Sequence, residues 1–440
     1  MNFMNDQIND DMLAVLKKEL IVAMGCTEPA AAALAGATAA TILRREFALE
    51  PERLSVAASR DLIKNAMSVG LPNSSLRGIK AAVVLGAVSG DPQDGLAVLA
   101  GITPEAEIRA RAFLDGDRID LTLRESAPAI FIEVTALAGG HEAVATFAHL
   151  HDKLESLCVD GVERIRPAGG KADVSSGKPV IFPNGYPSFA QMIDFADSVD
   201  PDALSFLVHA AVVNMRLSEH SLCEHYGIEV GRQSMTFAGN RSAIIDALNI
   251  ATAKAAAASD ARMAGSALPV VILSGSGTQG ITATVPVAVL AERIGASGES
   301  LARALALSSI VAITIASRKE RLSSLCGAFT AAIGTTCGFV RLLGGGKEQM
   351  NRAVNNMVGN LTGIICDGAK GTCALKIDSA VHAAALSALM AMDGKGAPAD
   401  AGIVGVDADA SIDHLERIVC EGMGLTDRTI LDIMLAKPGR

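Results

Sequence analysis

Apolar residues recur at helical spacing along most of this 440-residue chain. Ala, Leu, Ile and Val stand three or four positions apart over long stretches, and few Gly or Pro residues interrupt them. A period near 3.6 residues predicts α-helices with one apolar side. The clearest such segments run from Ala30 to Arg44, from Ser242 to Met263, from Glu299 to Arg318 and from Ser379 to Met392. We therefore expect a mostly helical protein, in which the many alanines let helices approach closely.

Between about Arg118 and Arg166 the apolar period drops to two, which predicts half-buried strands. Gly139-Gly140 and Asp160-Gly161 supply turn signals between these strands. The alternating segments are Arg118 to Leu123, Ala129 to Val134 and Glu142 to Phe147. This region predicts a small antiparallel sheet inside an otherwise helical protein.

These patterns give an α+β fold class and a division of the chain. Residues 167–188 are dense in Pro, Gly and Ser, which is typical of a linker. We predict a predominantly helical domain with the functional site, made of residues 1–107 and 189–440. A small inserted antiparallel β-rich subdomain takes residues 108–166, and 167–188 form the linker.

Composition narrows the classes of function. Half of the residues are hydrophobic and 20% are charged, so a disordered chain is excluded. The chain has 38 Lys and Arg against 48 Asp and Glu, a net charge of -10, and no Trp. A nucleic-acid-binding protein needs a basic face and usually stacking aromatics, so we expect no nucleic-acid partner.

The N-terminal residues are polar and acidic, unlike a signal peptide. The longest uncharged helical run, Ala304 to Ser317, is shorter than the roughly 20 residues of a membrane span. We expect a cytoplasmic protein with no membrane partner, whose eight cysteines are thiols or metal ligands. The many apolar helices are compatible with a homo-oligomer.

Gly275-Ser-Gly277-Thr-Gln-Gly280 fits the dinucleotide fingerprint G-x-G-x-x-G. It follows an apolar run, residues 268–273, and precedes a helical pattern, residues 281–294. A dinucleotide site also requires a second parallel strand that ends in an acidic residue, and neither is evident. Two other interpretations are favoured over a dinucleotide site: a helix-opening loop that binds a smaller anion, and a plain structural turn.

Four cysteines stand in unusual surroundings. Cys26 precedes a long Ala-rich helix with Thr27 as the expected N-cap, so the positive helix end should lower the thiol pKa. Cys326 lies in Leu-Cys-Gly-Ala, and Cys366 and Cys373 share a segment with glycines and lysines. The paired knuckles of zinc sites and the compact runs of ferredoxins are absent. The widely spread thiols predict a cluster held by three protein ligands, with one iron open to act as a Lewis acid.

Six segments together resemble one known family. They are GCTEP at 25–29, KNAMSVGLPN at 64–73, SDARMAG at 259–265, GSGTQG at 275–280, LCGA at 325–328 and CDGAKGTCALKI at 366–377. In this order they resemble the L-cysteine desulfidase family, which is related to the α subunit of iron–sulfur L-serine dehydratase. Thr278 departs from the Asn expected in the glycine loop.

The resemblance implies an oxygen-sensitive [4Fe-4S] enzyme that converts L-cysteine to pyruvate, ammonia and sulfide without pyridoxal phosphate. It implies that Cys326, Cys366 and Cys373 hold the cluster. Cys26 would be either an alternative ligand or the group that transfers a proton.

The expected chemistry is β-elimination, in which a base removes the α-proton of a small amino acid. The thiolate of Cys26 is the first candidate base and Lys370 the second. Arg262 could bind the substrate carboxylate bidentately, although an ion-paired helix residue is an equal reading, and Asn65 could meet the amino group. The other expected substrate-binding residues are Ser274, Gly275, Ser276, Gly277 and Gln279. The charged cluster at 318–321 suggests a solvated helix end.

Three alternatives stay open. L-serine or another β-substituted amino acid could be the substrate, because the sequence does not separate oxygen from sulfur leaving groups. A non-catalytic iron–sulfur or redox-sensing protein would have a fully ligated cluster. The glycine motif leaves a nucleotide-dependent dehydrogenase as the third.

Overall fold

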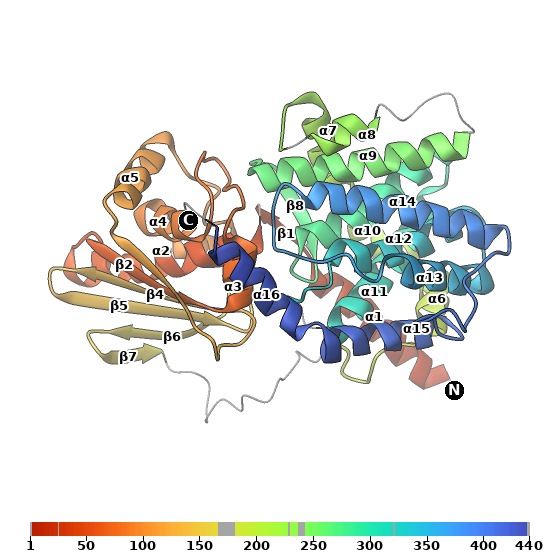
Figure 1. The fold of residues 1–440 in the computed structure, drawn as a ribbon, viewed down its shortest axis with the longest axis horizontal. Coiled ribbons are helices and arrows are strands. Elements are labelled where there is room, and N and C mark those ends of the chain that lie inside the picture. Colours follow the sequence, from red (N-terminus) through yellow and green to blue (C-terminus); the bar gives the residue numbers. More distant parts are fainter. Residues whose placement is uncertain are drawn as a thin grey trace.

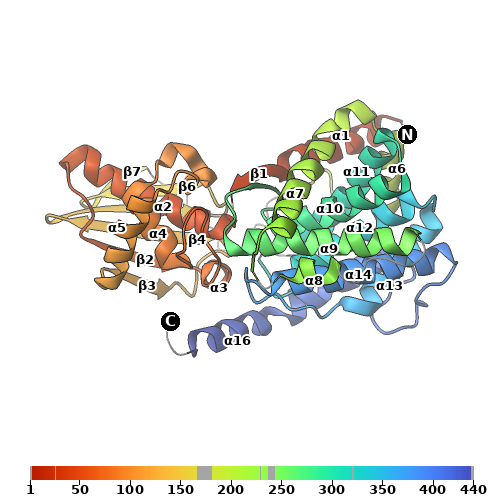
Figure 2. The same cartoon turned by 90° about the horizontal axis from the view of Figure 1, so that it is seen from above.

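The computed structural model describes residues 2–24, 26–165, 181–227, 229–235, 243–319 and 322–437. They form two lobes that lie side by side in both views of the ribbon (Figures 1 and 2). The smaller lobe comprises residues 27–165, and the larger lobe comprises the described residues of 2–24 and 181–423. The predicted α+β class with predominant helix is confirmed.

The smaller lobe contains α2 (Thr27–Phe47), β2 (Arg53–Ala58), α3 (Arg60–Ala66), α4 (Ile79–Ser89), the 3₁₀ segment η1 (Pro92–Ala97), α5 (Pro104–Asp115), β3 (Ile119–Leu123), β4 (Phe131–Ala138), β5 (His141–Ala148), β6 (Leu154–Val159) and β7 (Val162–Ile165). Its sheet has the order β3-β2-β4-β5-β6-β7. Every second residue of β4 is buried, and α2 and α4 cover the buried face of the sheet.

The sheet is mixed rather than purely antiparallel. β2 pairs parallel with β3 and antiparallel with β4, while the remaining pairs are antiparallel. β2 lies outside the segment 108–166, and the hydrophobic core under the sheet includes α2 and α4. The core of the smaller lobe therefore extends well before residue 108. Of the predicted linker 167–188, residues 167–180 lie outside the described residues.

The larger lobe contains α1 (Asn2–Glu19), β1 (Leu20–Met24), α6 (Phe189–Ser198), η2 (Pro201–Leu204), α7 (Ser205–Cys223), α8 (Val230–Met235), α9 (Ala243–Ala264), β8 (Pro269–Leu273), α10 (Gly277–Ile294), α11 (Gly298–Arg318), α12 (Gly327–Leu342), α13 (Lys347–Leu361), α14 (Cys373–Met392), α15 (Ala408–Arg417) and the π-helical turn η3 (Ile418–Gly422). Its central helices, α10 and α12, are buried on nearly all sides, as their uniformly apolar sequences require. The four segments predicted as helices from their apolar spacing are α2, α9, α11 and α14.

The C-terminal helix α16 (Gly424–Leu435) crosses from the larger lobe to the smaller one and lies beside α3 (Figure 1). Leu431 of this helix belongs to the hydrophobic core of the smaller lobe. A separate small cluster joins the lobes at their junction, with Cys26 and Val69 on one side and Met263 and Cys373 on the other. Segments from both ends of the chain thus meet at one place between the lobes.

Two helices of the described chain are long and apolar enough to cross a membrane, α11 and α14. In α11, 83% of the most apolar window is buried inside the protein, and in α14 56% is buried. The core helices of soluble proteins pass the same test. Their length and composition are therefore weak evidence for a membrane span.

Candidate active site

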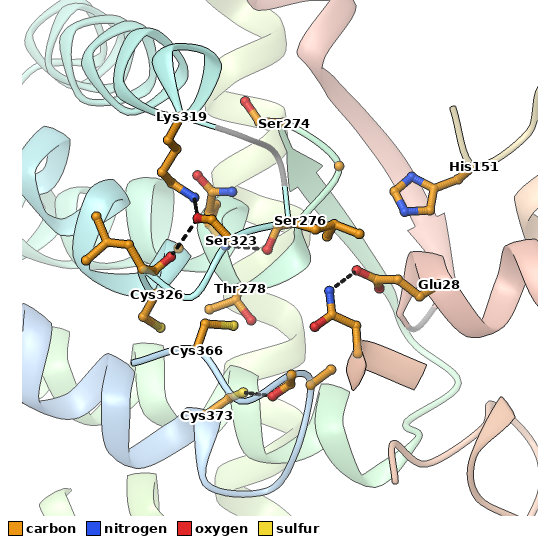
Figure 3. Close-up of a pocket in the computed structure, with 18 of the residues that line it drawn as sticks. Glu28, His151, Ser274, Ser276, Thr278, Lys319, Ser323, Cys326, Cys366 and Cys373 are labelled. Atoms are coloured by element: carbon orange, nitrogen blue, oxygen red, sulfur yellow. Dashed lines mark hydrogen bonds between the residues drawn. The ribbon is translucent and has the colours of Figure 1, made fainter. Parts of the chain in front are cut away.

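A cavity of about 70 Å³ lies where the two lobes meet. Glu28, Asn65 and His151 line it from the smaller lobe, and the remaining walls come from the larger lobe. Figure 3 shows Lys319 and three cysteines on one side of the cavity, and Glu28 and His151 on the other. The volume suits several water molecules or one small polar ligand rather than a dinucleotide.

The three cysteines at this cavity are Cys326, Cys366 and Cys373. Cys326 is the N-cap residue of α12, and Cys373 is the first residue of α14. Backbone hydrogen bonds hold Cys326 and Cys366 side by side: the Cys326 amide donates to the Ile364 carbonyl (2.9 Å), and the Cys366 amide donates to the Ser324 carbonyl (2.7 Å). The sequence prediction placed these three cysteines at one site, and the fold brings all three to one cavity.

The thiols influence one another strongly. A hydrogen bond from Cys326 lowers the pKa of Cys366, and the charge of Lys64 lowers it further against the effect of burial. The same hydrogen bond, together with burial, raises the pKa of Cys326. Burial and the nearby Cys366 raise the pKa of Cys373. One of the three thiols is therefore set up to ionise first, and a bound cation would be needed to ionise all three.

Buried lysines surround the thiols. Lys319 is 4% exposed, and its Nζ donates to the Ser323 hydroxyl at 3.2 Å. In the described residues no carboxylate lies within ion-pairing distance of Lys319, and burial lowers its pKa. Lys64 is fully buried and pairs with Asp427, so the charges of Cys366 and Asp427 raise its pKa although burial alone would lower it.

The suggestion of a solvated helix end at residues 318–321 is wrong for Lys319. This residue is the C-cap of α11, and its side chain points into the cavity (Figure 3). Its neighbour Arg318 is held by Asp413 and Glu416 instead. Residues 320–321 lie outside the described residues.

The glycine loop at 275–280 joins β8 to α10, as the apolar patterns on its two sides predict. β8 pairs antiparallel with β1, and in the described chain no second strand lies on its other side, so the βαβ unit of a dinucleotide site is missing. A Cβ atom on Gly280 would lie 2.0 Å from the Val271 carbonyl oxygen, and one on Gly277 would lie 2.3 Å from Nε of Arg262. These glycines allow the helix to pack on the strand and the guanidinium to reach the cavity.

Arg262 is a cavity residue rather than an ion-paired helix residue. It is 4% exposed, and its Nη1 donates to the Thr278 hydroxyl at 3.1 Å. No carboxylate of the described residues lies within ion-pairing distance of it, and its Nε has no hydrogen-bond partner there. Thr278, the position where the loop departs from the family pattern, therefore orients this guanidinium.

Three more buried polar atoms of the cavity lining have no hydrogen-bond partner within the described part of the chain. They are Oδ1 of Asn65, Oγ of Ser274 and Oε1 of Gln279. Buried polar groups are nearly always hydrogen-bonded, so orphans that face one cavity indicate a polar ligand. Gly275 and Ser276 also line the cavity, and Ser276 is the N-cap residue of α10. Gly277 is the one predicted substrate-binding residue that does not line the cavity; it packs against the Arg262 side chain instead.

The two expected bases lie off the cavity lining. Lys370 donates its Nζ hydrogen bond to the Asp367 carbonyl. Cys26, rather than Thr27, is the N-cap residue of α2. The expectation of a lowered Cys26 pKa is wrong, because burial raises it to about 12 and outweighs the charge of Arg262 and the positive helix end.

In the described residues no three His, Cys, Asp or Glu side chains are placed to hold a single metal ion. The donor set at the cavity is nevertheless the one that an iron–sulfur cluster uses, namely cysteine thiols. Cys326 and Cys373 stand at helix starts, and Cys366 lies in the connection between α13 and α14. A cluster offers each thiolate a different iron, so its ligands need not converge on one point. Lys64, Lys319, Lys376 and Arg262 lie close enough to offset the negative charge of such thiolates.

The cavity residues that the sequence prediction missed include Glu28, His151, Lys319 and Ser323. Glu28 stood inside the GCTEP segment, next to the cysteine that attracted the prediction. His151 lies in the connection between β5 and β6, and nothing in its local sequence points to the other lobe. Only the packing of the lobes brings these residues together.

Fold and cavity define a helical protein with a thiol-lined pocket beside a small α/β lobe. The chain belongs to the serine dehydratase alpha chain family, whose model matches residues 93–432. This membership places it among lyase-type enzymes resembling serine dehydratase. The matched residues include the glycine loop, Arg262 and the three cavity cysteines, whereas Glu28 and Asn65 precede them.

Relatives that match over nearly the whole chain are called UPF0597 proteins. A UPF0597 protein of Oleidesulfovibrio alaskensis is 43% identical over 423 residues, which cover 96% of this chain and 97% of that protein. A UPF0597 protein of Porphyromonas gingivalis is 37% identical over 441 residues, with 99% and 100% covered. One of Bacteroides fragilis is 38% identical over 435 residues, with the same coverage.

Proposed function

We propose that this protein catalyses the β-elimination of L-cysteine to pyruvate, ammonia and sulfide. The observation that carries the proposal is the meeting of three thiols in one small cavity with a buried guanidinium that has no ion-pair partner among the described residues. Thiols of this kind suit an iron–sulfur cluster, and the guanidinium suits the carboxylate of an amino acid. Serine dehydratase-like chemistry is the same elimination with a hydroxyl in place of the thiol.

Cys326, Cys366 and Cys373 would hold a [4Fe-4S] cluster. Bound there, the cluster would supply a Lewis acid for the leaving group. The chain's own residues do the rest. Arg262 binds the substrate carboxylate through its Nε, which has no hydrogen-bond partner in the described part of the chain, and the Ser274 hydroxyl helps. Gly277 and Thr278 keep the guanidinium in place.

Lys319 is the cavity-lining amine that can take the α-proton. Its Nζ forms one hydrogen bond, to a hydroxyl, and burial lowers its pKa toward the neutral form that a base requires. When the Cα–H bond breaks, the proton moves to Nζ and the electron pair of that bond forms the Cα=Cβ bond. The β-substituent then leaves with the electrons of its bond to Cβ. The resulting enamine tautomerises and hydrolyses to pyruvate and ammonia.

Eight free thiols in the described residues fit a reducing compartment. A cytoplasmic location and a homo-oligomer stay predictions of the sequence.

We expect the protein, reconstituted anaerobically with iron and sulfide, to release sulfide and pyruvate in equal amounts from L-cysteine. L-serine, assayed in parallel for pyruvate, separates the two leaving groups. Cluster content is followed by visible absorbance in the same samples. A cluster-bearing protein that releases pyruvate from L-serine alone would make it a serine dehydratase, and one that releases it from neither would overturn the proposal.

Replacing Lys319 by Met should lower kcat by roughly 100-fold or more, because the proton acceptor is lost while the buried volume is nearly kept. The cluster absorbance and the KM for L-cysteine should change little. Lys80→Met is the control, since Lys80 is exposed and lies outside the cavity lining. If Lys319→Met loses its cluster together with its activity, the lysine stabilises the thiolates and does not transfer the proton.

A further inference from the structure

Glu28 is a buried carboxylate at the cavity, and no described residue places a cation beside it. It is 7% exposed and lies in the first turn of α2. The Asn65 side-chain amide donates to its Oε1 at 3.1 Å, and the Thr27 hydroxyl donates to its Oε2 at 3.2 Å. In the described residues no Lys, Arg or His lies within ion-pairing distance of it. A carboxylate removed from water in this way needs a positive partner.

The neighbouring Asn65 also has a buried oxygen whose hydrogen-bonding capacity is unused in the described residues. Its Nδ2 is used by Glu28, but its Oδ1 is buried in the cavity lining with no donor among the described residues. Two oxygen acceptors, one of them charged, therefore adjoin on the same wall. A ligand group that satisfies both carries a positive charge and several N–H donors, as an ammonium group does.

The opposite charge stands elsewhere in the same cavity. Among the described residues the cationic Arg262 has no anionic partner and the anionic Glu28 has no cationic partner, yet the two do not pair with each other. A small ligand with an anionic and a cationic end fits between them. An α-amino acid is such a zwitterion, whereas a hydroxy acid or a thiol acid lacks the cationic end.

We propose that Glu28 and Asn65 form the binding subsite for the α-ammonium group of the substrate. The assignment rests on the proposed function, and it makes this wall the element that selects α-amino acids over the corresponding hydroxy acids. Thr27 fixes the subsite relative to the glycine loop, since the single hydrogen of its hydroxyl is shared between Glu28 and the nearer Gly275 carbonyl, at 2.8 Å. Both ends of the substrate are thereby set by one rigid frame.

Binding of L-alanine and L-lactate to the full chain, measured anaerobically by calorimetry, tests the subsite. L-alanine has no leaving group, so it binds without turnover, and L-lactate carries a hydroxyl in place of the ammonium. Glu28→Gln should weaken L-alanine binding by roughly 30-fold or more, because the ammonium loses a buried ionic partner. L-lactate binding should change less than about twofold, since Arg262 is untouched.

Glu105→Gln is the matched control. Glu105 occupies the same second position of its helix, α5, but is exposed and lies outside the cavity lining. Glu28→Asp, which keeps the charge on a shorter side chain, should regain part of the affinity for L-alanine. If Glu28→Gln is unfolded, Asn65→Ser reports on the same wall with a smaller loss confined to L-alanine.

Equal weakening of L-alanine and L-lactate by Glu28→Gln, or an unchanged affinity for L-alanine, would overturn the subsite. The same measurements separate it from the proposed reaction. If the wild-type protein binds L-alanine through Glu28 but releases neither sulfide nor pyruvate from L-cysteine, the subsite is supported and the proposed reaction is contradicted. If Glu28→Gln turns over L-cysteine as fast as the wild type does, the proposed reaction is retained and the subsite is overturned.

Discussion

Replacing Cys366 by Ala should abolish reconstitution of the cluster and lower the release of sulfide and pyruvate by far more than 100-fold. Changes in the surroundings of metal ligands already cost about 10–100-fold, and loss of a ligand costs more. Cys366 is the most sensitive of the three thiols, because its pKa is lowered by the hydrogen bond from Cys326 and by Lys64. Ala removes the thiol that ionises first. Visible absorbance after anaerobic reconstitution, iron content and both product assays measure the effect.

Cys337→Ala provides the control for this result. Cys337 is fully buried, but it lies inside α12 and outside the cavity lining, and its thiol donates to the Ile333 carbonyl at 3.3 Å. Its loss should leave absorbance and activity unchanged within about twofold. A Cys366→Ala protein that still forms an active cluster, or a Cys337→Ala protein that does not, would contradict the assignment of ligands.

The helices and strands could be predicted where the relevant signal is local. The periodicity of α9, α11 and β4 lies within each segment, and the run before the glycine loop and the helix after it are visible as a strand and a helix in sequence. The parallel pairing of β2 with β3 was not predicted, because it joins residues more than sixty positions apart. No local pattern in a six-residue strand specifies such a partner.

The site shows the same division between local and distant causes. The cysteines were found from their neighbours in sequence, but the pairing of Cys326 with Cys366 depends on a bridge between Leu325 and Ile365. The expectation of a lowered Cys26 pKa took only the helix start into account. Val69 and Met263, from the two lobes, help to bury the thiol, and burial shifts its pKa upward instead. Burial is a property of the assembled fold, so charged residues such as Lys319 were judged as surface residues.

The glycine loop illustrates how one sequence pattern supports different chemistry. In a dinucleotide site its glycines admit a pyrophosphate. Here Gly277 admits the side chain of Arg262 and Gly280 admits the backbone of β8. The glycine pattern indicates that another group packs closely against the backbone of the loop. The neighbouring strands and helices determine which group that is.

Asp427→Asn should lower the free energy of unfolding by about 3 kcal/mol, which is the lower end of the cost of breaking a buried ion pair. Lys64 is fully buried between the lobes, and Asp427 of α16 is its close partner. Asp61 remains at 3.6 Å and limits the loss. The other carboxylate oxygen of Asp427 accepts the amide hydrogen of Ser324 at 2.8 Å, so the same residue ties α16 to the segment before Cys326.

The pH dependence of this loss follows from Lys64. Its pKa is raised in the folded protein, because Cys366 and Asp427 outweigh the opposing effect of burial. A lysine whose pKa is raised on folding contributes stability at every pH below its ordinary value of 10.5 and loses it only as the pH rises through the folded value. The difference between wild type and Asp427→Asn should therefore be constant from about pH 6 to pH 9.

Urea unfolding of the cluster-free protein measures the stability, and hydrogen exchange measures the protection of α16. Asp432→Asn is the control, because Asp432 lies on the same helix, carries the same charge and is exposed. Since Leu431 of α16 packs in the core of the smaller lobe, loss of the ion pair should release the whole helix rather than one side chain. Equal unfolding midpoints for the two variants, or unchanged protection of α16, would show that hydrophobic packing alone holds the helix across the lobes. A selective loss in Asp427→Asn would instead make this ion pair the element that keeps the wall with Glu28 and the wall with the three thiols at a fixed separation.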